Sequence, residues 1–228
     1  MKQYDDLCKR VINEGVWTEN ARTGIRTKTV INASFEFDVS NGNIEVVNTR
    51  KSPLKMPMAE ITGYLKGLDN AQDFADIGSK TWFANANETQ AWLDNPHRKG
   101  ENDLGRLYGV QGRRWQKPDG STVDQLAGLI NNLERGVDSR GEILTFYNPG
   151  EFDMGALRPC LHSHQFSILG NDLYLTSTQR SADLPLGSVA NAIQVQGYGG
   201  IDNKAIDEFL TPTGDLLSFY LNLFKAIK

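Results

Sequence analysis

The spacing of apolar residues along the 228-residue chain predicts both helices and strands. Apolar positions recur at helical spacing in residues 1–16, 57–68 and 124–137, and we predict an amphipathic helix in each segment. Apolar and polar positions instead alternate in residues 30–37, and residues 143–147 are rich in β-prone side chains, so both are predicted strands.

Two hairpins are also indicated by the sequence. Residues 165–178 form two β-prone arms around a Gly-Asn-Asp turn at residues 170–172, and we expect a hairpin within a larger sheet. A second strand-turn-strand arrangement is predicted around the polar turn at residues 40–43, after a loop that carries Arg22 and Arg26. On the residues alone, these two arginines are ordinary solvated loop charges.

Less regular segments connect and follow these elements. Residues 70–96 are predicted to form short helices and loops, and residues 95–103 an exposed loop because they lack apolar side chains. After Asn191, two further helices are predicted at residues 201–210 and 214–227.

The charge balance limits the partners of the chain. Lys plus Arg number 24 against 28 Asp plus Glu, and the net charge of -4 argues against a surface that coats a polyanion. Residues 104–126 interleave arginines with aromatic side chains, a pattern that can bind nucleic acid by stacking, but the acidic balance disfavours a nucleic-acid polymer as partner. Neither a signal peptide nor an apolar run of membrane-spanning length is present, so we expect a cytoplasmic protein without a membrane partner.

The cysteines and histidines do not suggest a metal site. Cys8 and Cys160 lie far apart without metal-ligand spacing, and both are expected to be free thiols in a reducing compartment. His162 and His164 alternate with Ser163 and could project from one face of a strand, but nothing nearby completes a zinc set. No metal is therefore expected.

The stretch with the most suggestive chemistry is residues 159–191. It contains a thiol that can attack a substrate, Cys160, and an arginine that can hold an anion, Arg180. Asp183 and Asn191 add a carboxylate and an amide that can recognise a ring. A lone cysteine is otherwise a small buried hydrophobic residue, but these residue types within one short segment favour an active site that modifies a nucleotide.

Four segments in the same order resemble motifs of the thymidylate synthase family, which includes the pyrimidine nucleotide hydroxymethylases. They are ENDLGRLYGVQGRRW at 101–115, DQLAGLINNLERGVDSRGEIL at 124–144, ALRPCLHSHQF at 156–166 and LYLTSTQRSADLPLGSVAN at 173–191. Order and spacing agree from about residue 103 to 191, and more loosely from residue 3. The resemblance implies one domain, residues 1–228, with a family-like core at 1–191 and a divergent C-terminal part at 192–228.

The resemblance implies a fold and an assembly as well. We expect an α+β fold, with a twisted mixed sheet that carries helices on one face. The family buries the other face of this sheet against a second copy, which implies a homodimer.

The resemblance also implies an enzyme, a transferase that moves a one-carbon unit from 5,10-methylenetetrahydrofolate to C5 of a uracil deoxynucleotide, dUMP to dTMP. The pyrimidine C5 is too weak a nucleophile to react directly, so a thiolate first adds at C6 and makes C5 enolate-like. Cys160 matches the family's nucleophile.

Glu60 matches the glutamate that organises water and proton transfer, although an acid early in a helix can also be a surface residue that stabilises the helix dipole. Tyr108 matches the tyrosine near the proton-abstraction site.

Nucleotide and folate ligands follow from the same motifs. The implied substrate-binding residues are those of the phosphate site and of the ring site: Arg22, Arg140, Gln179, Arg180, Ser181 and Asn191. Arg140 matches an arginine that reaches across the dimer, and Asn191 matches the asparagine that pairs with N3–H and O4 of uracil. Hydroxymethylases that act on cytosine nucleotides tend to carry aspartate there, so Asn191 favours uracil. Trp82, Asp183 and Gly187 match positions of the folate site.

Several departures from the family pattern leave alternatives open. Leu161 replaces the histidine after the nucleophile, Gly141 the second arginine of the dimer pair, and Asn85 the second tryptophan of the folate site. A downstream His-x-Tyr segment and the tail that closes over folate are not found. Because water exclusion decides whether a one-carbon intermediate becomes methyl or hydroxymethyl, a dUMP or dCMP hydroxymethylase is one alternative. A nucleotide-binding family member without catalysis is the other.

Overall fold

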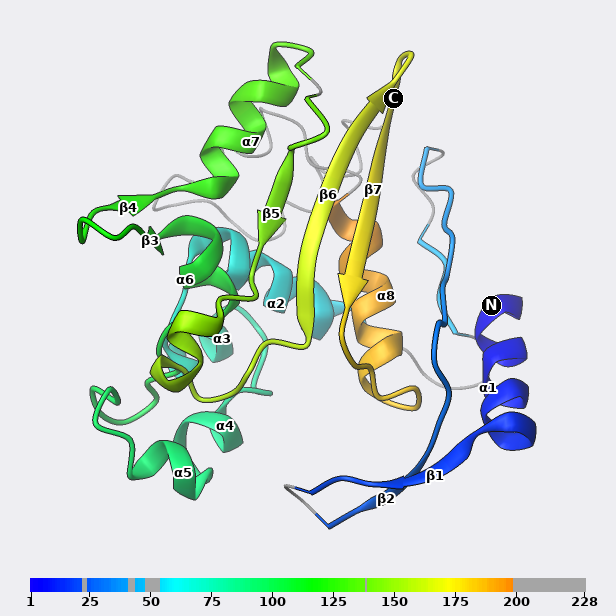
Figure 1. The fold of residues 1–228 in the computed structure, drawn as a ribbon, viewed down its shortest axis with the longest axis horizontal. Helices are drawn as coiled ribbons and strands as arrows, with labels where there is room; N and C mark the ends of the chain where they lie inside the picture. The colour runs from blue at the N-terminus through cyan, green and yellow to red at the C-terminus, as the bar shows by residue number, and fades with distance from the viewer. Residues whose placement is uncertain (22–23, 41–43, 48–53, 138, 199–228) are drawn as a thin grey trace.

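The computed structural model describes residues 1–21, 24–40, 44–47, 54–137 and 139–198 (Figure 1). Arg22, the predicted turn at 40–43 beyond Ser40, and the two helices predicted after residue 200 lie outside these residues. Within them, no helix combines the length and the apolar character that crossing a bilayer requires.

A three-stranded antiparallel sheet forms the centre of the structure (Figure 1). Its order is β5 (Ile143–Thr145), β6 (Leu161–Leu169) and β7 (Asp172–Gln179). The predicted hairpin of β6 and β7 is confirmed, with Leu169 paired to Asp172 and Gly170 in the left-handed region at φ 66°. Leu144, in β5, and Phe166, in β6, are buried on the face that meets the helices.

Helices cover that inner face of the sheet. α2 (Lys55–Lys66) and α8 (Gly187–Tyr198) lie behind β6 and β7 in the view of Figure 1. α6 (Tyr108–Arg113) and α7 (Gln125–Glu134) pack beside β5. The predicted α+β class is confirmed, and every strand pair in the described part of the chain is antiparallel, so the mixed sheet that we expected is not seen among these residues.

The remaining elements surround this unit. α1 (Lys2–Glu14) confirms the predicted N-terminal helix, and short helices occupy residues 70–96 as expected. These elements are β1 (Val16–Glu19), β2 (Arg26–Thr29), α3 (Ala71–Asp76), α4 (Phe83–Asn87), α5 (Gln90–Leu93), β3 (Trp115–Gln116), β4 (Thr122–Val123) and the 3-10 helix η1 (Pro149–Met154).

One sequence prediction about this outer part is wrong, and another is confirmed. The predicted strand at 30–37 is not formed, and the N-terminal hairpin instead pairs β1 with β2, so that it encloses the loop at residues 20–25. The loop predicted at 95–103 is confirmed: residues 95–102 form neither helix nor strand and are exposed or half-buried. Asp103, at its end, is buried, and its carbonyl oxygen accepts from Trp92 Nε1 at 2.7 Å.

An aromatic cluster forms the core between α2, α3, α6 and the sheet. Its rings belong to Tyr64, Phe74, Trp82, Tyr108 and Phe146. A Cβ atom at Gly63 would lie 2.1 Å from the Phe74 ring, so only glycine lets α2 approach α3 this closely. This contact fixes the helix from which Tyr64 and Glu60 project.

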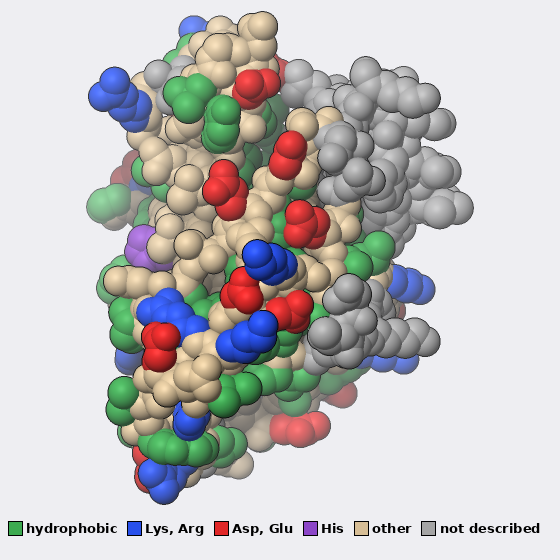
Figure 2. Space-filling model, turned by 90° about the vertical axis from the view of Figure 1, so that its right-hand side faces the viewer, with side chains coloured by type: hydrophobic (Ala, Val, Ile, Leu, Met, Phe, Trp, Pro, Cys, Tyr) green, Lys and Arg blue, Asp and Glu red, His purple; other side chains and the backbone are tan. Residues whose placement is uncertain are grey.

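The N-terminal side of the molecule carries charges of both signs. Figure 2 shows acidic and basic side chains intermixed in the middle and lower part of the face that lies on the right of Figure 1. A mixed surface of this kind does not form the extended positive potential that attracts a polyanion.

Candidate active site

Cys160 lies where the chain enters β6, and it is held there by two other segments. Its backbone N–H donates to Tyr108 Oη at 2.9 Å, and its carbonyl oxygen accepts from the Arg180 N–H at 2.9 Å. The thiol is free and half-buried. A helix residue and the residue after β7 therefore fix the backbone of Cys160 while its sulfur remains accessible.

The Arg180 side chain is anchored beside this cysteine. Nε donates to the carbonyl oxygen of Pro159 at 2.8 Å, and Nη2 donates to that of Arg158 at 3.0 Å. A guanidinium carries five N–H donors, so further donors remain for an anion.

Tyr108 lies buried between Cys160 and the aromatic core. The pKa of Tyr108 is raised to about 12, mainly by burial and then by the charge of a Cys160 thiolate. Backbone hydrogen bonds and Arg180 lower it by a smaller amount. The phenol therefore stays protonated at neutral pH and can donate its O–H next to the sulfur.

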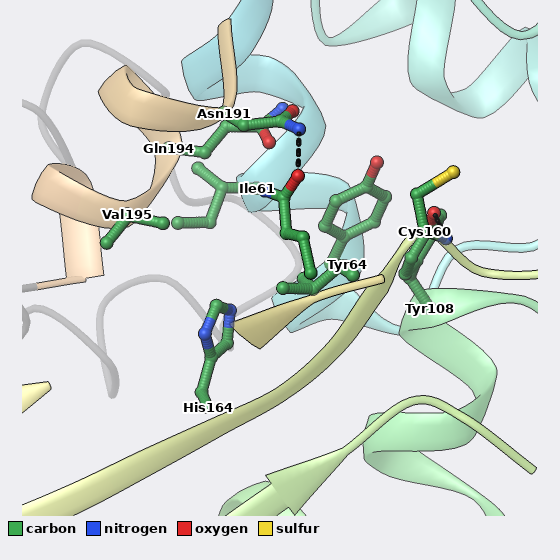
Figure 3. Close-up of a pocket in the computed structure, with 10 residues that line it drawn as sticks. Ile61, Tyr64, Tyr108, Cys160, His164, Asn191, Gln194 and Val195 are labelled. Carbon is green, nitrogen blue, oxygen red and sulfur yellow. Dashed lines mark hydrogen bonds between the residues drawn. The ribbon is translucent and has the colours of Figure 1, made fainter. Parts of the chain in front are cut away.

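A pocket opens between β6, β7, α2 and α8, with Cys160 at one end (Figure 3). In it, Asn191 Nδ2 donates to Gln179 Oε1 at 3.0 Å, the bond drawn as a dashed line in Figure 3. The enclosed space is about 40 Å³, room for only a few water molecules. The residues that line it are Ile61, Tyr64, Tyr108, Cys160, Leu161, His164, Gln179, Asn191, Gln194 and Val195.

Glu60 lies on α2 behind this pocket and is partly buried. Its Oε1 atom accepts from the hydroxyl groups of Ser79, at 3.4 Å, and Thr81, and its Oε2 atom accepts from Gln194 Nε2 at 2.7 Å. Burial raises the pKa of Glu60, whereas these three donors lower it by a smaller amount. The carboxylate is thus reached from the pocket through Gln194.

The structure brings four of the predicted site residues to the pocket wall: Tyr108, Cys160, Gln179 and Asn191. Trp82 instead lies behind Tyr108, with 6.1 Å between the ring centroids, and is only 7% exposed. It belongs to the aromatic core in this structure.

The other predicted ligands lie around the pocket rather than in its wall. Asp183 Oδ1 accepts from the Leu186 N–H at 2.9 Å and so fixes the turn that leads to Gly187, the first residue of α8. Ser181 is exposed after β7. Arg140 lies in the loop before β5 with φ 62°, and Arg22 is outside the described residues.

Two residues of the pocket wall, His164 and Gln194, were missed by the sequence-based prediction. Gln194 lies on α8, which we did not predict, and its spacing of three residues from Asn191 would have placed both on one helix face. The expectation that His162 and His164 share a face is wrong: a β-bulge between Leu161 and Ser163 leaves His162 exposed, whereas His164 is fully buried. Among the described residues, no group of three His, Cys, Asp or Glu side chains could hold a metal ion.

Comparisons with known proteins agree with the motifs of the sequence. The family model described as thymidylate synthase matches residues 2–198. Thymidylate synthase from Pseudoalteromonas translucida is 63% identical over 194 residues, which cover 85% of this chain and 69% of the relative. The enzymes of the same name from Mannheimia succiniciproducens and Vibrio cholerae are each 62% identical over 195 residues, or 86% of this chain and 69% of the relative. The chain belongs to the thymidylate synthase family.

Proposed function

We propose that the chain is a thymidylate synthase, a transferase that carries a one-carbon unit from 5,10-methylenetetrahydrofolate to C5 of dUMP and forms dTMP. The observation that most supports this function is the convergence of Cys160, Tyr108 and Asn191 on one pocket from three separate segments. The relatives that match over 85% or more of the chain are named for this reaction.

The proposed chemistry begins at the sulfur of Cys160. Its thiolate forms a bond to C6 of the pyrimidine, and the electrons of the C5–C6 double bond move toward C5 and the O4 carbonyl. C5 then attacks the methylene carbon and loses its proton, and the bond from that carbon to the folate nitrogen breaks to leave an exocyclic methylene. A hydride from the tetrahydrofolate reduces this methylene to methyl and leaves dihydrofolate, and the S–C6 bond breaks to restore the C5–C6 double bond and release the thiolate. The buried Tyr108 hydroxyl, protonated at neutral pH, provides a polar group beside the proton that leaves C5.

The orientation of the Asn191 side-chain amide supports uracil as the base. Asn191 Nδ2 is directed to Gln179 Oε1, so Asn191 Oδ1 can accept the uracil N3–H while the second Nδ2 hydrogen donates to O4. Cytosine offers an acceptor at N3 and a donor at C4, which this orientation does not match. Gln179 therefore contributes to base selection by fixing the amide of Asn191.

Phosphate and folate are assigned to the residues around the pocket. We assign the 5'-phosphate to Arg180 and Ser181 of this chain, together with Arg22. Arg180 supports this role because its guanidinium is anchored by backbone carbonyl groups and keeps free donor capacity. Folate is assigned to the side of the pocket that carries Asp183 and Gly187, and Trp82 packs behind that side in the core.

We place the reaction in the cytoplasm, where the free thiols stay reduced.

The proposed activity is tested by incubating the protein with dUMP and methylenetetrahydrofolate. We expect dTMP and dihydrofolate as products, and a rate with dCMP lower by a factor on the order of 10² or more, because two hydrogen bonds to the base are mismatched. Hydroxymethyl-dUMP with tetrahydrofolate would establish the hydroxymethylase alternative instead. Absence of product from either nucleotide would leave a nucleotide-binding protein without catalysis.

We also propose that the chain acts as a homodimer through the outer face of β5, β6 and β7, with Arg140 directed to the partner's phosphate site. That face carries small polar side chains, among them Thr176 opposite Gln165. Thr176→Lys would place two like charges near the interface, and light scattering is expected to show the mass of one chain instead of two. Thr122→Lys, the same change on exposed strand β4, should remain dimeric. A monomeric wild type would contradict the proposal.

A further inference from the structure

Gln194 is the residue that connects the pocket to the partly buried carboxylate of Glu60. Gln194 lines the pocket and is only 8% exposed, whereas Glu60 does not contribute to the lining among the described residues. The 2.7 Å hydrogen bond from Gln194 Nε2 to Glu60 Oε2 joins α8 to α2 at this point. Figure 3 shows Gln194 on the same helix as Asn191, which faces the pocket.

The two oxygen atoms of Glu60 have different surroundings. Oε1 accepts hydrogen bonds from the hydroxyl groups of Ser79 and Thr81, which lie in the segment between α3 and α4 and do not line the pocket. Oε2 receives a single donor among the described residues, the amide of Gln194. A carboxylate is stabilised by each N–H or O–H group that donates to it. Removal of the Gln194 amide therefore leaves Oε2 without a donor from the described residues.

The position of Gln194 along α8 relates this carboxylate to the base. Asn191 and Gln194 are three residues apart, a spacing that brings their Cβ atoms to about 5–6 Å on one helix face. Glu60 Oε2 is therefore held within one helical turn of the amide to which we assign N3 and O4 of uracil. Leu161, which also lines the pocket, offers only an apolar side chain.

We propose that Gln194 is a positioning residue: its amide holds Oε2 of Glu60 toward the base-binding end of the pocket and favours the carboxylate form of Glu60. The role of Glu60 in the reaction rests on the proposed function. The hydrogen bond and its effect on Glu60 are properties of the free protein and do not depend on turnover.

The test is the titration of Glu60 in the full chain without substrate, followed by carbon-13 NMR of the side-chain carboxyl groups and assigned with Glu60→Gln. In Gln194→Met, which keeps the length of the side chain and removes the donor, we expect the midpoint to rise by about one to two pH units. In Gln194→Glu two carboxyl groups share the site, so the midpoint should rise there as well. Gln194→Glu tests the proposal if Gln194→Met does not fold.

Gln196→Met is the matched control. Gln196 is buried on the same helix but bonds to backbone atoms of Glu45 and Ala192, so the Glu60 midpoint should stay at the wild-type value. An unchanged midpoint in the folded Gln194 variants, or an equal shift in Gln196→Met, would overturn the proposal.

The kinetic consequence separates a positioning role from a purely structural one. In Gln194→Met the acid limb of the kcat profile should move upward by the shift seen in the titration, whereas KM for dUMP changes by less than about threefold. A change in KM with an unmoved acid limb would overturn the proposal. A wild type without product contradicts the proposed function, and the titration still decides the role of Gln194.

Discussion

Replacement of Cys160 by alanine is expected to abolish release of tritium from C5 of labelled dUMP, with a loss on the order of 10⁴-fold or more. The C5–H bond becomes labile only after a nucleophile has added at C6, and within the pocket wall Cys160 supplies the thiol. Tritium release reports this step whether the final product is methyl or hydroxymethyl. The measurement therefore tests the covalent step separately from the fate of the one-carbon unit.

Cys8→Ala provides the matched control, because Cys8 is the second free thiol of the chain. It packs against a separate small cluster formed by Tyr4, Val47 and Val189, which is distinct from the main core. Its replacement should leave tritium release near the wild-type rate. Release by Cys160→Ala at the wild-type rate would exclude this thiol as the nucleophile.

The elements predicted best were those that bury one regular face, because their apolar residues then recur at the period of a helix or strand. α2, α7 and the β6–β7 hairpin each bury a regular stripe or alternate side chains against the core, and each was predicted close to its observed bounds. Residues 30–37 carry the same alternation but form no strand in the structure. An alternating pattern indicates which side chains could be buried on one face of a strand. It does not indicate whether a neighbouring strand is present to form the backbone hydrogen bonds.

The motifs predicted pocket residues as far as Asn191, in the first half of α8, and none beyond it. Tyr108, Gln179 and Asn191 occur in segments that resemble the family motifs, and all three reach the pocket wall. Gln194 lies beyond the last of these segments, on a helix whose weak amphipathic pattern gave no prediction. Trp82 was predicted as a folate-site residue from its match to the family motif, and the structure shows its ring packed against Phe74 and Tyr108. Its contact with folate stays a prediction.

Acidification from pH 7 to pH 4 is expected to remove about 3 kcal/mol of stability through His164 alone. This histidine is fully buried on β6, between Leu144 and Ser177 on the neighbouring strands and against the edge of Phe146. Burial lowers the pKa of His164 from 6.5 to about 3, because a charged imidazole would lose its hydration there. The unfolded chain therefore binds the proton first, and stability falls as the pH drops below 6.5 toward about 3.

His164→Phe isolates this contribution in urea unfolding measured at several pH values. Burial raises the pKa of Glu60, so Glu60 has the opposite effect, and its contribution to stability is lost as the pH rises. Because Glu60 is present in both the wild type and His164→Phe, its contribution cancels in the difference between their unfolding free energies. The difference in unfolding free energy between wild type and His164→Phe should thus shift by about 3 kcal/mol in favour of the variant from pH 7 to pH 4. His162→Phe, an exposed histidine two residues earlier that stacks on Tyr147, should keep the wild-type acid dependence. If His164→Phe and wild type lose stability in parallel, His164 accepts its proton in the folded protein, and its surroundings are more polar than the buried position on β6 implies.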